Sequence, residues 1–267
     1  MTPFPFLISI PHGGDGIPPE VADNVNITQE DVFYDGDTLA QDLYDFKDRV
    51  AALVAMPIAR AILDVNRAPD DQPPDNPDGV IKTVTLQGKP VYKEGFFPGN
   101  DVVHTLLKNY YFPYHEKITA LLKSSQIRLA FDCHAMLECA PSIDTNPGQA
   151  RPLVCLSNGG DERGAPAKKK SSITCHREWI QALAESFKHV FTTKGNVTVN
   201  NPFTGGYTSW YHYRASGVPW IQIELNRKLY LTDPYFDAER LHVDKERIAE
   251  LRERIFSAIE RFWKMIS

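Results

Sequence analysis

Short apolar runs rich in β-branched and aromatic residues alternate with longer amphipathic segments along most of this 267-residue chain. Such alternation is typical of a sheet whose faces are covered by helices, because each helix buries its apolar stripe against the sheet. The expected fold class is therefore α/β, with a mixed, largely parallel sheet. No internal repeat or long low-complexity linker divides the chain, so we expect residues 1–267 to form one domain.

The expected elements follow from apolar periodicity. The strands are short and apolar, and they are Phe6–Ile10, Ala59–Val65, Ile127–Cys133, Pro152–Leu156, Val197–Asn200 and Trp220–Leu225. The helices carry apolar residues at three- and four-residue spacing, and they are Thr38–Val50, Val102–Lys123, His176–Phe191 and Asp237–Met265. Two polar stretches, Ala68–Gly79 and Gly159–Ser172, are expected to be surface loops.

Charge and cysteine usage exclude several classes of protein. The net charge of -5 is spread along the chain, so no basic face is available for nucleic acid. The opening segment has no basic region and its apolar stretch stops at Pro11, which predicts neither a signal peptide nor a membrane span. The cysteines show no CxxC spacing, so we expect partly buried thiols in a reducing cytoplasm; they are Cys133, Cys139, Cys155 and Cys175.

Ionisable side chains stand where several predicted strands end. His12 follows the first strand and His134 follows the strand that ends at Cys133. In open α/β sheets ligands bind beyond the carboxyl ends of the strands, where these imidazoles are expected to meet. Either histidine alone would also fit a hydrogen-bonded structural role, but two at equivalent strand ends favour a metal site, since zinc prefers neutral imidazole nitrogens.

A third ligand is expected from the acidic turn that precedes the helix at Thr38. Asp35 and Asp37 both qualify and spacing alone does not separate them, although Asp37 would also serve as the N-cap of that helix. Asp132 lies two residues before His134 and so faces the same side of an extended strand, where its carboxylate can orient the imidazole.

Glu224 lies in an apolar strand that would ordinarily exclude a carboxylate. It therefore needs a metal, a water molecule to act on, or a buried partner such as Arg227. Arg67 is interpreted either as a bidentate clamp for a substrate carboxylate or as a structural ion pair.

Several sequence blocks, in order over nearly the whole chain, carry a family resemblance. They are ISIPHGG (8–14), DGDTLAQDLYDF (35–46), RAILDVNR (60–67) with the following PDD, YH (114–115), DCHAM (132–136), NPFTGGY (201–207) and QIELNRKLY (222–230). With these blocks the chain resembles the N-formylglutamate amidohydrolase family. The resemblance implies an α/β/α three-layer sandwich like that of zinc carboxypeptidases and aspartoacylases, one catalytic zinc, and hydrolysis of N-formyl-L-glutamate to L-glutamate and formate in histidine degradation.

Carried over to matching positions, the resemblance implies a role for each site residue. It makes His12, Asp37 in preference to Asp35, and His134 the metal ligands, with Glu224 as the general base. It also implies that Asn66 and Arg67 clamp a carboxylate, that Arg60 holds a second carboxylate or polarises the scissile carbonyl, and that Gly205, Gly206 and Tyr207 contact substrate. Two departures, Ala135 after DCH and a longer loop at Gly159–Ser172, bear on which acyl amino acid fits.

Three other functions remain open at this point. One is an inactive dicarboxylate-binding protein that uses Arg60 and Arg67, and another is a deacylase or carboxypeptidase for a different N-acyl amino acid. A third is a cysteine hydrolase using Cys133 or Cys175, although each cysteine directly adjoins its nearest histidine, which places the thiol badly for proton transfer. Two histidines and one carboxylate also suit iron, cobalt or nickel, and the oligomeric state is not predicted.

Overall fold

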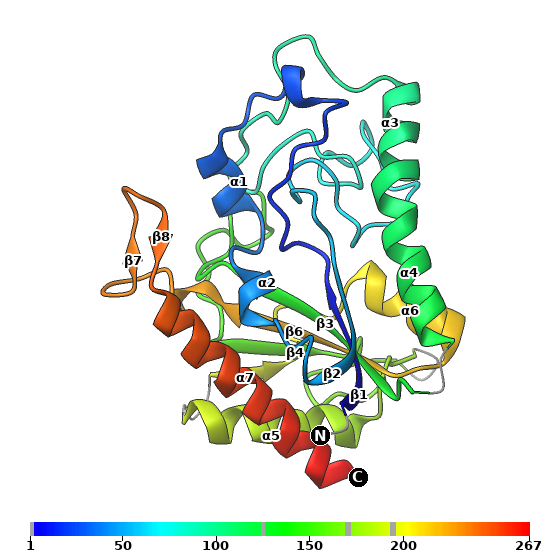
Figure 1. The fold of residues 1–267 in the computed structure, drawn as a ribbon, viewed down its shortest axis with the longest axis vertical. Helices are drawn as coiled ribbons and strands as arrows, with labels where there is room; N and C mark the ends of the chain where they lie inside the picture. The colour runs from blue at the N-terminus through cyan, green and yellow to red at the C-terminus, as the bar shows by residue number, and fades with distance from the viewer. Residues whose placement is uncertain (1–2, 124–125, 169–171, 193–195) are drawn as a thin grey trace.

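The computed structural model describes residues 3–123, 126–168, 172–192 and 196–267. Its centre is a six-stranded sheet in the order β2-β1-β3-β6-β4-β5 (Figure 1). The strands are β1 (Phe4–Ile10), β2 (Val50–Ala55), β3 (Leu129–Met136), β4 (Val154–Ser157), β5 (Val197–Val199) and β6 (Trp220–Asn226). Neighbouring strands are parallel, except that β4 runs antiparallel to β6. The predicted mixed, largely parallel sheet is confirmed.

Helices cover both faces of this sheet. On one face lie α2 (Ala40–Leu43), α5 (Arg177–Phe191) and the long α7 (Lys245–Ile266), and on the other lie α4 (Phe112–Leu122) and α6 (Tyr207–Ser216) (Figure 1). α3 (Asn100–Leu106) runs through a π-helical turn (Leu107–Tyr111) into α4. The remaining elements are α1 (Gln29–Asp35), the 3-10 turns Ala22–Asn24 and Arg227–Leu229, and the hairpin of β7 (Phe236–Asp237) and β8 (His242–Val243).

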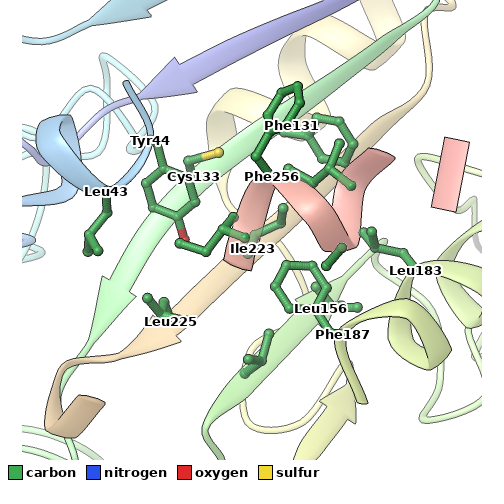
Figure 2. Close-up of a cluster of buried hydrophobic side chains, with 14 of the residues drawn as sticks. Leu43, Tyr44, Phe131, Cys133, Leu156, Leu183, Phe187, Ile223, Leu225 and Phe256 are labelled. Atoms are coloured by element: carbon green, nitrogen blue, oxygen red, sulfur yellow. The ribbon is translucent and has the colours of Figure 1, made fainter. Parts of the chain in front are cut away.

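Strand alternation divides the core into two hydrophobic clusters, one on each face. In β3, Phe131 and Cys133 belong to the cluster under α5 and α7, whereas Ala130 belongs to the cluster under α4. Figure 2 shows the first cluster, with Cys133 among large apolar side chains from β6 and α7. All eight residues of β3 are buried, as expected of a central strand with both faces covered.

Two predicted elements are wrong. Ala59–Val65 forms turns and isolated bridges rather than a strand, and its Arg60 and Asp64 side chains belong to a buried ion-pair network. Thr38–Val50 is helical only over Ala40–Leu43, and Val50 instead begins β2. In both segments the apolar pattern reflects the burial of the side chains, and it did not identify the backbone conformation.

The other predicted strands and helices are confirmed within a few residues, although the last helix begins at Lys245 because the β7–β8 hairpin precedes it. Ala68–Gly79 is irregular, as predicted, and so are the described parts of Gly159–Ser172; residues 169–171 lie outside the described residues. Within the described ranges, no helix is both long and apolar enough to cross a membrane.

Candidate active site

Three ionisable side chains come from adjacent strands at the centre of the sheet. His12 lies two residues beyond the end of β1, His134 lies in β3, and Glu224 lies in β6 directly opposite His134 in the strand register. Because β1, β3 and β6 are consecutive in the sheet, residues far apart in the chain share one end of it. His134 had been expected just after the end of its strand. β3 instead continues to Met136, so His134 lies within the strand.

Asp37 lies with the two imidazoles. Its Oδ2 is 3.0 Å from His134 Nδ1 and 3.7 Å from His12 Nδ1, and one ligand atom from each of the three residues lies within 4.8 Å of the others. Asp35 points elsewhere: it is 3.4 Å from Arg60 and accepts a hydrogen bond from the Leu86 amide. Asp37 is not a helix cap either, because the N-cap residue of α2 is Leu39.

A second carboxylate stands behind each imidazole. His12 Nε2 is 2.7 Å from Asp64 Oδ1, and His134 Nε2 is 3.4 Å from Asp132 Oδ2. Asp132 in turn accepts a hydrogen bond from Ser9 Oγ at 3.0 Å. A carboxylate on Nε2 favours the tautomer that leaves Nδ1 free as a metal ligand. The expected position of Asp132 behind His134 is thus observed. The contact of Asp64 with His12 was not predicted, because Asp64 had been assigned to an apolar strand. The sequence signal that could have identified Asp64 is its acidic side chain within that apolar run.

The electrostatics of the cluster are those of buried, mutually stabilising charges. Burial opposes ionisation of Asp37, but hydrogen bonds and charges from His12 and His134 lower its pKa well below the usual value. Burial likewise disfavours charge on His134, but Asp132, Glu224 and Asp37 raise its pKa well above the usual value. The carboxylates that favour a proton on His134 would equally favour a metal cation bound to the neutral imidazole.

Glu224 is the carboxylate whose environment favours the neutral form. Burial, assisted by Asp37, raises the pKa of Glu224 to about 7 against the opposing charge of His134. Gln222 Nε2 donates to Glu224 Oε1 at 2.9 Å and fixes the carboxylate. The suggested partner Arg227 instead pairs with Asp37 at 3.2 Å, so it does not neutralise Glu224.

Arg60 and Arg67 belong to a dense charged network on the β1 side of the site. Arg60 lies 3.2–3.5 Å from the carboxylates of Asp35, Asp64 and Asp78. Arg67 pairs with Asp78 at 2.7 Å, and the fully buried Lys82 lies 2.9 Å from Asp64. Structural ion pairs are therefore present at both arginines, although both also line the cavity.

These groups surround one cavity of about 320 Å³. Its lining includes His12, Asp37, Arg60, Asn66, Arg67, His134, Gly205, Gly206 and Glu224. Asn66 Nδ2 lies 3.4 Å from His134 Nε2, and a Cβ added at Gly206 would lie only 2.1 Å from that Nδ2, so a side chain there would displace the Asn66 amide. Tyr207 is not among the described lining residues, since its ring stacks on Tyr211.

The buried cysteines are not activated nucleophiles. Cys133 is fully buried in the apolar cluster of Figure 2, and burial raises its pKa well above the usual value. Burial also raises the pKa of Cys175 to about 12. A reactive thiol needs a lowered pKa, so the geometry does not support a cysteine hydrolase.

The fold and site together define an α/β protein in which a buried carboxylate with a raised pKa lies beside a candidate metal-binding cluster. The sequence profile of the N-formylglutamate amidohydrolase family matches residues 4–231, and the chain belongs to that family. It is therefore a hydrolase that acts on an amide bond.

Individual relatives agree with this assignment. The chain is 26% identical to an N-formylglutamate deformylase of Pseudomonas aeruginosa over 263 residues, covering 96% of this chain and 92% of the relative. It is also 26% identical to an N-formylglutamate deformylase of Pseudomonas putida over 254 residues, covering 89% and 86%. The crystal structure of an N-formylglutamate amidohydrolase from Ralstonia eutropha JMP134 shares the fold, with a TM-score of 0.73, 19% identity, and coverage of 98% and 94%.

Proposed function

We propose that this protein hydrolyses N-formyl-L-glutamate to L-glutamate and formate with one divalent cation, zinc in the first instance, held by His12, Asp37 and His134. The observation that carries the proposal is the grouping of these three ligand atoms within 4.8 Å, with Glu224 lining the same cavity. The names of the two deformylase relatives support the substrate. Cytoplasmic action in histidine degradation belongs to the same proposal and is supported by the resemblance.

The donor set fits the proposed cation. Two imidazole nitrogens and one carboxylate form a three-ligand set that leaves a coordination position open, as catalytic zinc sites require. The carboxylates of Asp64 and Asp132 behind the two rings are the partners that such histidine ligands usually have. When bound, a cation supplies Lewis-acid stabilisation of negative charge on the carbonyl oxygen and makes water more acidic.

The residues of the chain supply the proton transfers and the binding. Glu224 accepts a proton from the attacking water as the water oxygen bonds to the formyl carbon, and passes that proton to the departing nitrogen as the C–N bond breaks. Arg60 adds positive charge on the cavity wall for the developing oxyanion. Asn66 and Arg67, beside the loop of Gly205 and Gly206, bind the α-carboxylate.

A substrate panel tests the reaction itself. Purified, zinc-loaded protein is expected to have its highest kcat/KM on N-formyl-L-glutamate among N-formyl and N-acetyl amino acids, because the cavity carries several cations for a dicarboxylate. Release of formate and of the free amine is measured for each compound. A clear preference for a neutral or N-acetylated amino acid would instead assign the chain to a related deacylase.

Asp132 tests the orientation of the metal site. Asp132→Asn is expected to weaken zinc binding by about 10- to 100-fold, because the carboxylate behind His134 is lost. Competition against a chromogenic chelator measures the affinity. The variant at the neighbouring exposed position, Arg128→Gln, serves as the control, and unchanged zinc affinity in Asp132→Asn would remove Asp132 from the metal site.

A further inference from the structure

Among the described residues, four arginines line the cavity: Arg60, Arg67, Arg151 and Arg227. Three of them have partners that account for their positions. Arg227 donates to two backbone carbonyl oxygens and to Asp37. Arg60 is shared among three carboxylates, and Arg67, whose side chain is 35% exposed, pairs with Asp78.

Arg151 differs from the other three. Its side chain is only 8% exposed, yet it has a single ion pair, Nη2 to Asp144 Oδ2 at 3.1 Å. Its buried Nε has no hydrogen-bond acceptor in the described part of the chain. The guanidinium therefore has more N–H donors than the described protein atoms satisfy, and because Arg151 lines the cavity, a ligand there can supply a further acceptor to the guanidinium.

The surroundings of Arg151 hold the guanidinium in place. Its Cζ lies 4.8 Å from the centre of the Phe203 ring, and stacking on an aromatic ring leaves the N–H edge of a guanidinium free to meet a carboxylate. The Phe203 carbonyl is itself held by Ser157 Oγ at 2.6 Å, and Asn226 at the end of β6 donates to the Arg151 carbonyl. The Arg151 guanidinium therefore lies on a loop that is held by hydrogen bonds to the sheet.

Arg151 and the segment that carries Arg60, Asn66 and Arg67 are attached to different strands beside the metal cluster. Arg151 precedes β4 and contacts the end of β6, whereas Arg60 connects through Asp64 to His12 at the end of β1. In the sheet, β3 with His134 lies between β1 and β6. The two carboxylates of one substrate can therefore each meet a different arginine of the cavity.

We propose that Arg151 is a specificity-determining residue that binds the side-chain carboxylate of the acyl amino acid through its guanidinium, while Asn66 and Arg67 take the α-carboxylate. The inference rests on the proposed function and adds to it the source of the preference for an acidic amino acid.

The test compares two substrates that differ only in the charge of the side chain. In Arg151→Gln, kcat/KM for N-formyl-L-glutamate is expected to fall about 10- to 100-fold, the range expected for loss of a charge-assisted hydrogen bond. For N-formyl-L-glutamine the change is expected to stay within about threefold, because no charged partner is lost. Equal losses on both substrates would overturn the proposal and place Arg151 at the α-carboxylate or in a structural role.

Asp144→Asn is the matched control. It removes the ion pair of Arg151 but leaves the guanidinium in place, so substrate discrimination is expected to be retained. If Asp144→Asn reproduces the effect of Arg151→Gln, the arginine serves the loop rather than the ligand, and the proposal is wrong.

A binding measurement separates this proposal from the proposed function. Calorimetry on the zinc-loaded protein compares glutarate, which has two carboxylates, with butyrate, which has one. Arg151→Gln is expected to weaken glutarate at least about tenfold and to leave butyrate unchanged. If the wild type hydrolyses no N-formyl amino acid but shows this pattern, the reaction is wrong and the carboxylate subsite stands. If N-formyl-L-glutamate is hydrolysed and glutarate binding ignores Arg151, the reaction stands and the subsite is wrong.

Discussion

Glu224→Gln is expected to lower kcat for N-formyl-L-glutamate by about 10²- to 10⁴-fold, the usual cost of losing one proton-transfer group. The glutamine amide keeps the size of the side chain and can still bond to Gln222, so the fold and the zinc content are expected to remain unchanged. Steady-state formate release and metal analysis measure the two effects separately. Glu116→Gln, on the exposed surface of α4, is the control with the same chemical change.

The pH profile provides an independent check on Glu224. The carboxylate acts as a base only when deprotonated, and burial raises its pKa to about 7, so kcat/KM is expected to fall as the pH drops through that pKa. The positive charge of a bound cation shifts this acidic limb to lower pH. Glu224→Gln should lose the limb together with the activity. Wild-type turnover in that variant would show that another group is the base.

Removal of one histidine is expected to have the largest effect on metal binding. His134→Ala leaves one imidazole and one carboxylate, so zinc affinity should fall by more than the roughly 10- to 100-fold seen when only a partner behind a ligand is lost. Activity should fall in parallel, because the cation supplies the Lewis acid of the proposed reaction. Chelator competition gives the affinity, and thermal unfolding with and without zinc shows whether the protein is still stabilised by the metal.

His189→Ala is the matched control, because His189 is exposed on α5 on the opposite side of the sheet from α4. It should bind zinc like the wild type. Stoichiometric zinc at wild-type affinity in His134→Ala would contradict the proposed ligand set, whatever happens to the rate.

The residues of the site could be predicted from the sequence better than the backbone that carries them. His12 and His134 were expected together because both stand near strand ends, and they do lie together. The choice between Asp35 and Asp37 required the fold, since the turn directs one carboxylate to Arg60 and the other to the imidazoles. Arg151 lies in an irregular loop without a recognisable pattern, and only its contacts single it out.

The errors in the predicted fold have a common cause. Apolar periodicity reports burial, not backbone geometry, so it cannot separate a buried strand from a buried turn. Ala59–Val65 is apolar because it packs in the cluster under α4, while its backbone forms turns. Helix α6 (Tyr207–Ser216) was not predicted, because aromatic and polar residues lie around most of its circumference and it has no single apolar face. α5 and α7 were found because each has one continuous apolar face.

The cavity is lined both by residues of the central strands and by residues of connecting loops, and these two groups differ in how readily they can be substituted. The candidate ligand His134 and the proposed base Glu224 are fixed side by side in the central strands, where a shift of register would move every neighbour. Arg151 and Phe203 lie on connecting loops, which accept insertions and substitutions without displacing the sheet. We therefore expect substitutions in these loops to change which amino acid is bound, while the proposed metal ligand and base in the strands stay in place.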